Sequence, residues 1–101
     1  MTYVEDQSLA PVTREVAVAR AAVAGEQIVP RSRCIDWLLD CLNAARRPTV
    51  RAIIVDELTA LSPARNLRTA DFEHSLDQIQ LALQVDEVFD QFVLEADASD
   101  D

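Results

Sequence analysis

The segment from residue 32 to residue 47, SRCIDWLLDCLNAARR, constrains the fold more than any other stretch. Its polar side chains Asp36, Asp40 and Asn43 are spaced i, i+4 and i+7, so on a helix they form one narrow stripe. The rest of its circumference is largely apolar. A helix with so thin a polar face must be covered on nearly every side. The sequence therefore predicts a central apolar helix over residues 32–47, around which the other segments pack.

The composition indicates the fold class. The chain has 101 residues, half of them apolar, with one Gly and four Pro. This length fits one small domain, and the shortage of Gly argues against the many turns of a β-sandwich or barrel. Abundant Ala and Leu favour helices. We expect an all-α fold, a small four-helix domain over residues 11–94, with a flexible N-terminus (1–10) and a disordered acidic tail (95–101).

Three further helices follow from apolar spacing and end signals. We expect one from Thr13 to Ala24, closed by Gly25 as a left-handed cap, a second starting at Thr49, and a third starting at Thr69. The last helix has two apolar stripes: Phe72, Leu76, Ile79 and Leu83 form the first, and Leu81, Val85, Val88 and Phe92 form the second. It is either one piece or bent near Asp86. Residues 26–31 are predicted to be an extended linker with Ile28 in the core.

Charge is distributed unevenly along the chain, whose net charge is −9. Residues 1–68 hold all nine Arg and eight acids, whereas residues 69–101 hold ten acids and no Arg or Lys. The acids of the last helix give three readings: a solvated face, a docking surface for a basic protein, or a mimic of nucleic-acid phosphates. The candidate partner-binding residues are Asp71, Glu73, Asp77, Asp86, Glu87 and Asp90.

The arginines could form a basic edge around the second and third helices; the set is Arg31, Arg33, Arg46, Arg47, Arg51, Arg65 and Arg68. A nucleic-acid reader usually has a net positive domain and a recognisable motif. Here the acidic last third offsets these cations. We therefore favour pairing between these arginines and the acids of residues 69–101 over direct contact with nucleic acid.

Residues that could carry chemistry are few. Cys34 and Cys41 lie seven residues apart, a rise of about 10 Å on a helix, which is too far for a disulfide. We expect them to be buried thiols beside Trp37. His74 could carry a phosphoryl group, but Glu73 and Asp77 would repel it, so a plain surface histidine is favoured. No metal-ligand spacing, Gly-rich phosphate loop or nucleophile motif occurs, so we expect neither an enzyme nor a cofactor.

A hydrophobic pattern spans residues 15–61. An Ala/Val-rich segment ends in Ala24-Gly25-Glu26. It is followed by Ile28-Val29, by CIDWLLDCL from Cys34 and by AIIVDEL from Ala52. This pattern resembles the small AriR-type biofilm-development and two-component connector proteins. The resemblance implies an all-helical, dimeric, non-enzymatic regulatory protein. The long acidic helix after Leu67 departs from that family.

The apolar faces exceed what four short helices can cover, so we expect a homodimer. The predicted seam consists of Trp37, Cys34, Leu38 and Cys41. The predicted function is that of a small cytoplasmic regulatory or adaptor protein that binds a protein with a basic surface, and neither nucleic acid nor membrane. The alternative is a phage-type inhibitor or DNA mimic, such as an anti-CRISPR protein, acting through the acidic last helix. No targeting or membrane-spanning segment is recognisable.

Overall fold

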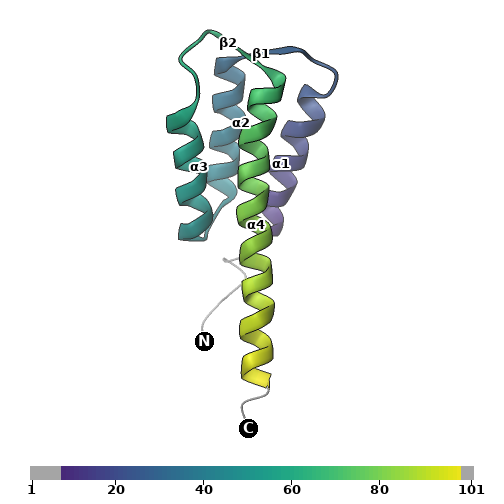
Figure 1. Ribbon diagram of the computed structural model, residues 1–101, viewed down its shortest axis with the longest axis vertical. Coiled ribbons are helices and arrows are strands. Elements are labelled where there is room, and N and C mark those ends of the chain that lie inside the picture. The colour runs from purple at the N-terminus through teal and green to yellow at the C-terminus, as the bar shows by residue number, and fades with distance from the viewer. Residues whose placement is uncertain (1–7, 99–101) are drawn as a thin grey trace.

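Residues 8–98 form four helices and two short strands. The structure is a computed structural model that describes residues 8–98, with side chains described as far as residue 93. The elements in order are α1 (Ala10–Val23), β1 (Ile28–Pro30), α2 (Arg31–Ala44), α3 (Pro48–Ala60), β2 (Asn66–Arg68) and α4 (Thr69–Ala98) (Figure 1). The prediction of a helical fold with four helices is confirmed, with a small sheet added.

The four helices surround one core. α1 and α3 each pack against both α2 and α4. The core consists mainly of Val12, Val16, Ala19, Val23, Val29, Cys34, Leu38, Cys41, Ala45, Val50, Ile54, Leu67, Phe72, Leu76, Ile79 and Leu83. α2 buries Cys34, Leu38 and Cys41 but leaves Leu39 41 % exposed. A helix covered on nearly every side is therefore not confirmed, because each helix of such a bundle turns one face inward.

Proline and glycine set several helix ends. Pro11 and Pro48 occupy the first positions of α1 and α3, where a missing N–H costs nothing. Gly25 has φ +83°, the left-handed conformation expected after α1. Thr13 does not cap α1, because its hydroxyl donates to the carbonyl of Leu9 inside the helix. α2 ends at Ala44, so Arg47 lies in the turn before α3.

The two strands pair antiparallel at one end of the bundle, where they join the α1–α2 connection to the α3–α4 connection (Figure 1). Val29 lies opposite Leu67, and both are buried. Ile28 lies opposite Arg68 and is 58 % exposed. The prediction that Ile28 enters the core is therefore wrong: alternate residues of a strand face opposite sides, and the register turns Val29 inward.

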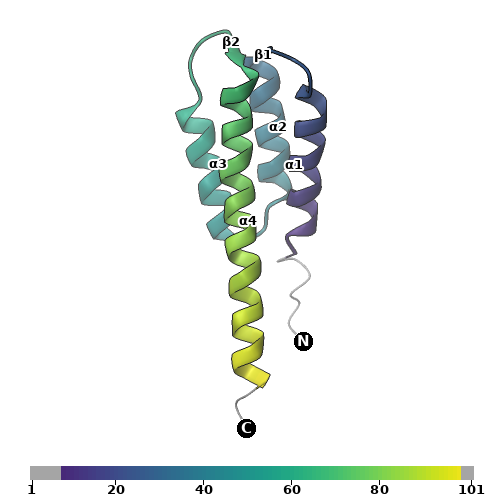
Figure 2. The same ribbon diagram turned by 45° about the vertical axis from the view of Figure 1, so that its right-hand side comes forward.

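α4 is a single helix that runs through Asp86 without interruption and reaches Ala98. Its 30 residues are about twice the length of α1 or α2, and its second half extends past the bundle in both ribbon views (Figures 1 and 2). Residues 95–98 of the predicted tail are thus helical, while residues 1–7 and 99–101 lie outside the described residues. Among residues 8–98, no helix is long and apolar enough to cross a membrane.

Candidate functional site

The inward face of α4 changes from apolar to acidic along the helix. Over the bundle half (residues 69–83), Phe72, Leu76, Ile79 and Leu83 are buried. The next positions on the same face, i+3 and i+7 from Leu83, are Asp86 and Asp90. Two carboxylates therefore replace the apolar line at the start of the projecting half (residues 84–98).

Arg47, which lies in the turn between α2 and α3, binds both carboxylates. Its Nη1 donates to Asp90 Oδ1 at 3.0 Å and lies 3.7 Å from Asp86 Oδ2, while its Nη2 contacts the other Asp90 oxygen. The Thr49 hydroxyl donates to Asp86 at 2.6 Å. The side chains of Arg47 and Asp86 are only 17 % and 18 % exposed. The hydrogen bond with Asp90 raises the pKa of Arg47, so this cluster anchors the projecting half as an ion pair.

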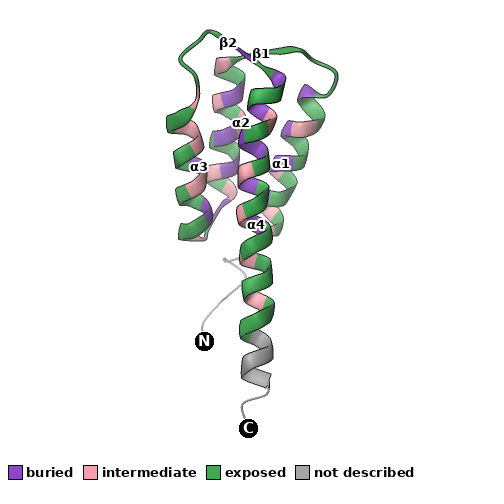
Figure 3. Ribbon diagram, viewed as in Figure 1, coloured by how far each residue is buried: buried purple, intermediate pink, exposed green. Residues whose placement is uncertain are grey.

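The outward face of α4 is apolar from the last turn of the bundle half, at Leu81, into the projecting half. We call Leu81, Val85, Val88, Phe89 and Phe92 the outer stripe. These side chains are between 54 % and 68 % exposed, and Val93 at the edge of the stripe is exposed as well. As far as residue 93, Figure 3 shows the projecting part of α4 as exposed except at Asp86 and Asp90, in contrast to the bundle half. Contiguous apolar surface of this kind typically marks a binding site.

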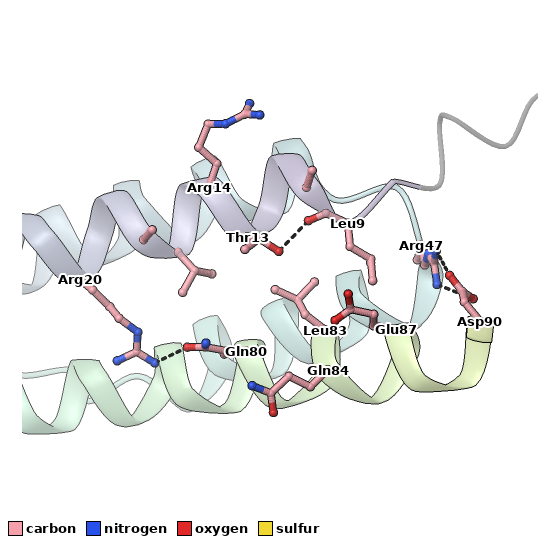
Figure 4. A pocket seen from close by; sticks show the side chains of 13 residues that line it. Leu9, Thr13, Arg14, Arg20, Arg47, Gln80, Leu83, Gln84, Glu87 and Asp90 are labelled. Atoms are coloured by element: carbon pink, nitrogen blue, oxygen red, sulfur yellow. Dashed lines mark hydrogen bonds and ion pairs between the residues drawn. The ribbon is translucent and has the colours of Figure 1, made fainter. Parts of the chain in front are cut away.

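A groove of about 760 Å³ separates the first turns of α1 from α4 (Figure 4). Leu9 and Leu83 contribute apolar surface to it, and Arg20 spans it by donating to Gln80 at 2.9 Å. The pair of Arg47 and Asp90 closes one end. The groove therefore lies between the core and the base of the projecting half, and its lining suits contact with mixed apolar and polar side chains.

The acids of α4 do not form one continuous face. Asp77 contacts Arg20, Asp71 lies 3.6 Å from Arg68, and Asp86 and Asp90 meet Arg47. The remaining two candidates are Glu73, which is half-buried, and Glu87, which is exposed. Pairing within the chain, the favoured reading of the arginines, thus holds for Arg47 and Arg68. Sequence reasoning placed all six acids on one docking surface; the structure brings together only Asp86 and Asp90.

Other arginines of the predicted basic edge bind backbone or an aromatic ring. Arg51 donates to the carbonyls of Leu42 and Ala45, each at 2.9 Å, and so holds the α2–α3 turn. Arg31 donates to the carbonyl of Ser62 at 2.7 Å. The Arg33 guanidinium lies 4.9 Å from the centre of the Trp37 ring system. Through these contacts the arginines stabilise turns, loops and helix ends within the chain.

The predicted dimer seam is corrected by the structure. Cys34, Leu38 and Cys41 are completely buried inside a single chain, because their i, i+4, i+7 spacing points all three into the core. Trp37 is half-buried, with its ring centre 5.6 Å from that of Phe72. These side chains stabilise the bundle and leave the surface of α2 to other residues.

Both cysteines are free thiols, as expected. Burial, assisted by the nearby Glu15 and Asp40 carboxylates, raises the pKa of Cys41 to about 12. Burial likewise raises the pKa of Cys34. His74 is exposed on α4 and borders a small pocket with Ser75 and Asp71. No cluster of three potential metal-ligating His, Cys, Asp or Glu side chains is found within residues 8–98.

Most of the outer stripe is visible in the sequence as the second apolar line of the last helix, but the sequence does not show which of the two lines the bundle covers. Phe89, the residue that widens it, was not singled out. The signal was the length of the pattern, since the apolar spacing of α4 continues well past the reach of the shorter helices. Comparison of the chain with protein-family models, with curated proteins and with solved structures finds no match.

Proposed function

We propose that this is a non-enzymatic regulatory or adaptor protein that acts by binding other polypeptides through the projecting half of α4. The observation that carries the proposal is the outer stripe, whose large apolar side chains are more than half exposed. Leaving five such residues in water on a helix that the bundle does not cover is unfavourable unless a partner covers them. The proposal includes a homodimeric assembly and a protein partner with a basic surface.

The basic character of the partner follows from the charge around the stripe. Residues 69–101 carry ten acids without a Lys or Arg, and Glu87 lies exposed within the projecting half. A partner surface rich in Lys or Arg would complement these acids. Rim charges of this kind speed association and select partners more than they add affinity.

The non-enzymatic part of the proposal is supported by the state of the nucleophiles. Both thiols are buried, with raised pKa values, so at neutral pH they are protonated and inaccessible. Two free thiols also suit the reducing cytoplasm, which we propose as the place of action.

The alternative of a DNA mimic has less support. A mimic must present carboxylates where phosphates would lie, yet Asp77, Asp86 and Asp90 are engaged by arginines of the same chain. An adaptor that uses the apolar stripe requires none of these groups to be available. We therefore retain protein binding as the proposed function.

Site-specific photo-crosslinking tests this proposal in the intact chain. A photoreactive residue at Phe92 should form covalent adducts with polypeptide, whereas the same residue at Val55, an exposed apolar position on α3, should form few. The mass of each adduct separates a second copy from a different protein. Equal adduct formation from both positions would contradict a binding role for α4.

A further inference from the structure

We propose that the outer stripe is a self-association seam on which two copies of this chain pair α4 against α4 in antiparallel orientation. The inference rests on the proposed function and names the occupant of that same surface. Four features of α4 carry it: the spacing of the stripe, its symmetry, the position of the charges and the length of the helix.

The spacing is that of helices that pack along their length. Leu81, Val85, Val88 and Phe92 are separated by four, three and four residues, the alternation of core positions in a coiled coil. They lie on one face over an axial length of about 16 Å. Phe89 borders this line and widens it. A second helix with the same spacing matches the face residue for residue.

The stripe is symmetric about the point between Asp86 and Glu87. Reversing one copy about that point puts Leu81 opposite Phe92 of the second copy, and Val85 opposite Val88 of the second copy. Each of the two outer layers therefore pairs a leucine with a phenylalanine, and each of the two inner layers pairs two valines. The contact is related by a two-fold axis, so it closes with two chains.

The charges permit this approach despite the net charge of −9. Asp86 and Asp90 lie on the opposite face of α4, where Arg47 holds them. The four seam positions themselves, Leu81, Val85, Val88 and Phe92, are all apolar. Two acidic chains can thus meet along the stripe without placing carboxylates in the seam.

Charge also selects the orientation. A parallel pair would set the acidic C-terminal ends side by side, at an interhelical distance of about 8–10 Å. The antiparallel pair places the two Val93 positions about 20 Å apart along the axis, which exceeds the screening length of about 8 Å at physiological salt. Repulsion between the acidic ends is therefore much weaker in the antiparallel pair.

The length of α4 favours the same arrangement. Four seam positions cover less than two heptads, whereas a free-standing coiled coil usually needs about three or four. In the antiparallel pair, the end of each α4 lies beside the bundle half of the other, where Asp77 is already paired with Arg20. The bundles lie on the far side of each α4, because the core face and the outer stripe are opposite, and they do not obstruct the pairing.

Sedimentation velocity on the full chain tests the seam. The wild type is expected to be a dimer at micromolar concentration, and Val88→Glu to be monomeric, with dimer affinity lowered about a hundredfold or more because two carboxylates enter an apolar contact. Val55→Glu on α3 is the matched control, an exposed valine changed in the same way away from the stripe. It should remain a dimer, and circular dichroism should show all three chains equally helical.

Disulfide trapping tests the orientation. Chains carrying Leu81→Cys and chains carrying Phe92→Cys, distinguishable by mass, are mixed and oxidised mildly, while the native thiols stay buried. Antiparallel pairing predicts mixed disulfides between the two variants; predominance of like-with-like disulfides overturns the orientation. A monomeric wild type, or a Val88→Glu dimer, overturns the seam. A monomer whose Phe92 position still crosslinks to a different protein would overturn the homodimer but leave the binding of another protein through α4 intact.

Discussion

The bundle half and the projecting half of α4 place their apolar side chains on opposite faces of one continuous helix. In the bundle half, Phe72 and Ile79 point into the core while His74 faces solvent. In the projecting half, Asp90 occupies the inward face and Phe92 the outward one. One half thus serves the fold of a single chain, and the other is suited to association. The difference shows that an amphipathic pattern can change sides without a break in the helix.

Substitutions of two phenylalanines of α4 should give the largest difference in unfolding free energy between the two halves. Phe72 is fully buried and contacts Trp37, so Phe72→Ala should lower the free energy of unfolding by about 3–5 kcal/mol. Phe92 is mostly exposed, so Phe92→Ala should change it by less than about 1 kcal/mol in the monomer. Urea unfolding at a concentration where no dimer forms measures both values. Similar losses for the two variants would remove the distinction between the halves.

Alkaline pH should weaken the bundle through its thiols. Cys41 has a pKa of about 12 in the folded chain against 9.0 for an ordinary thiol, so above pH 9 the unfolded state releases a proton that the folded state keeps. The contribution of Cys41 to stability is therefore constant below pH 9 and falls as the pH rises towards 12, by about 2 kcal/mol at pH 10.5. The chain has no Lys and one Tyr, so few other side chains titrate in this range.

Urea unfolding at pH 8 and pH 10.5 measures this loss. Cys41→Ala is the control: it is less stable at both pH values, but the part of the pH dependence due to this thiol should disappear. An unchanged pH dependence in the variant would mean that Cys41 is not the group that titrates.

The junction between the two halves should depend on Arg47. Arg47→Met removes the cation that receives Asp86 and Asp90, and leaves two partly buried carboxylates next to each other. We expect a loss of about 1–2 kcal/mol. Arg14→Met, at an exposed position on α1, should cost less than about 0.5 kcal/mol. Thermal unfolding of both variants provides the comparison, and equal melting temperatures would show that the Arg47 cluster does not stabilise the fold.

The smallest expected effect is the difference in unfolding free energy between substitutions of two acids of α4. Asp77 forms a solvent-exposed pair with Arg20, so Asp77→Asn should change the free energy of unfolding by about 0.5 kcal/mol or less. Asp86→Asn should cost about 1 kcal/mol, because Asp86 is largely buried between Thr49 and Arg47. High salt should reduce the first effect more than the second. The reverse ranking would contradict the view that the inward acids anchor the projecting half.

The sequence predicted the helices well because their apolar spacing and end signals are local. Gly25 closes α1 as expected, and the two stripes of the last helix are those that the structure shows. The errors concern long-range contacts. Val29 rather than Ile28 is buried because the strand pairs with Leu67, 38 residues away in sequence.

The candidate site was harder to predict for the same reason. The apolar face of α2 was evident, but whether Cys34 and Leu38 face the core or a second chain depends on how the other helices pack. Pairing of Arg47 with acids of the last third was expected, but the charge pattern did not show which acids, and the structure selects Asp86 and Asp90. Periodicity identifies a face of a helix, but it does not say what covers that face.

The placement of the helix ends has a practical consequence for handling the protein. α1 begins at the end of the bundle from which α4 projects, and the β1–β2 sheet lies at the other end (Figures 1 and 2). A purification tag or fluorescent fusion joined to the projecting end of α4 would therefore occupy space next to the outer stripe and mask an association that the untagged chain shows. A short epitope inserted after Pro63, in the exposed loop that leads to β2, keeps the label at the opposite end.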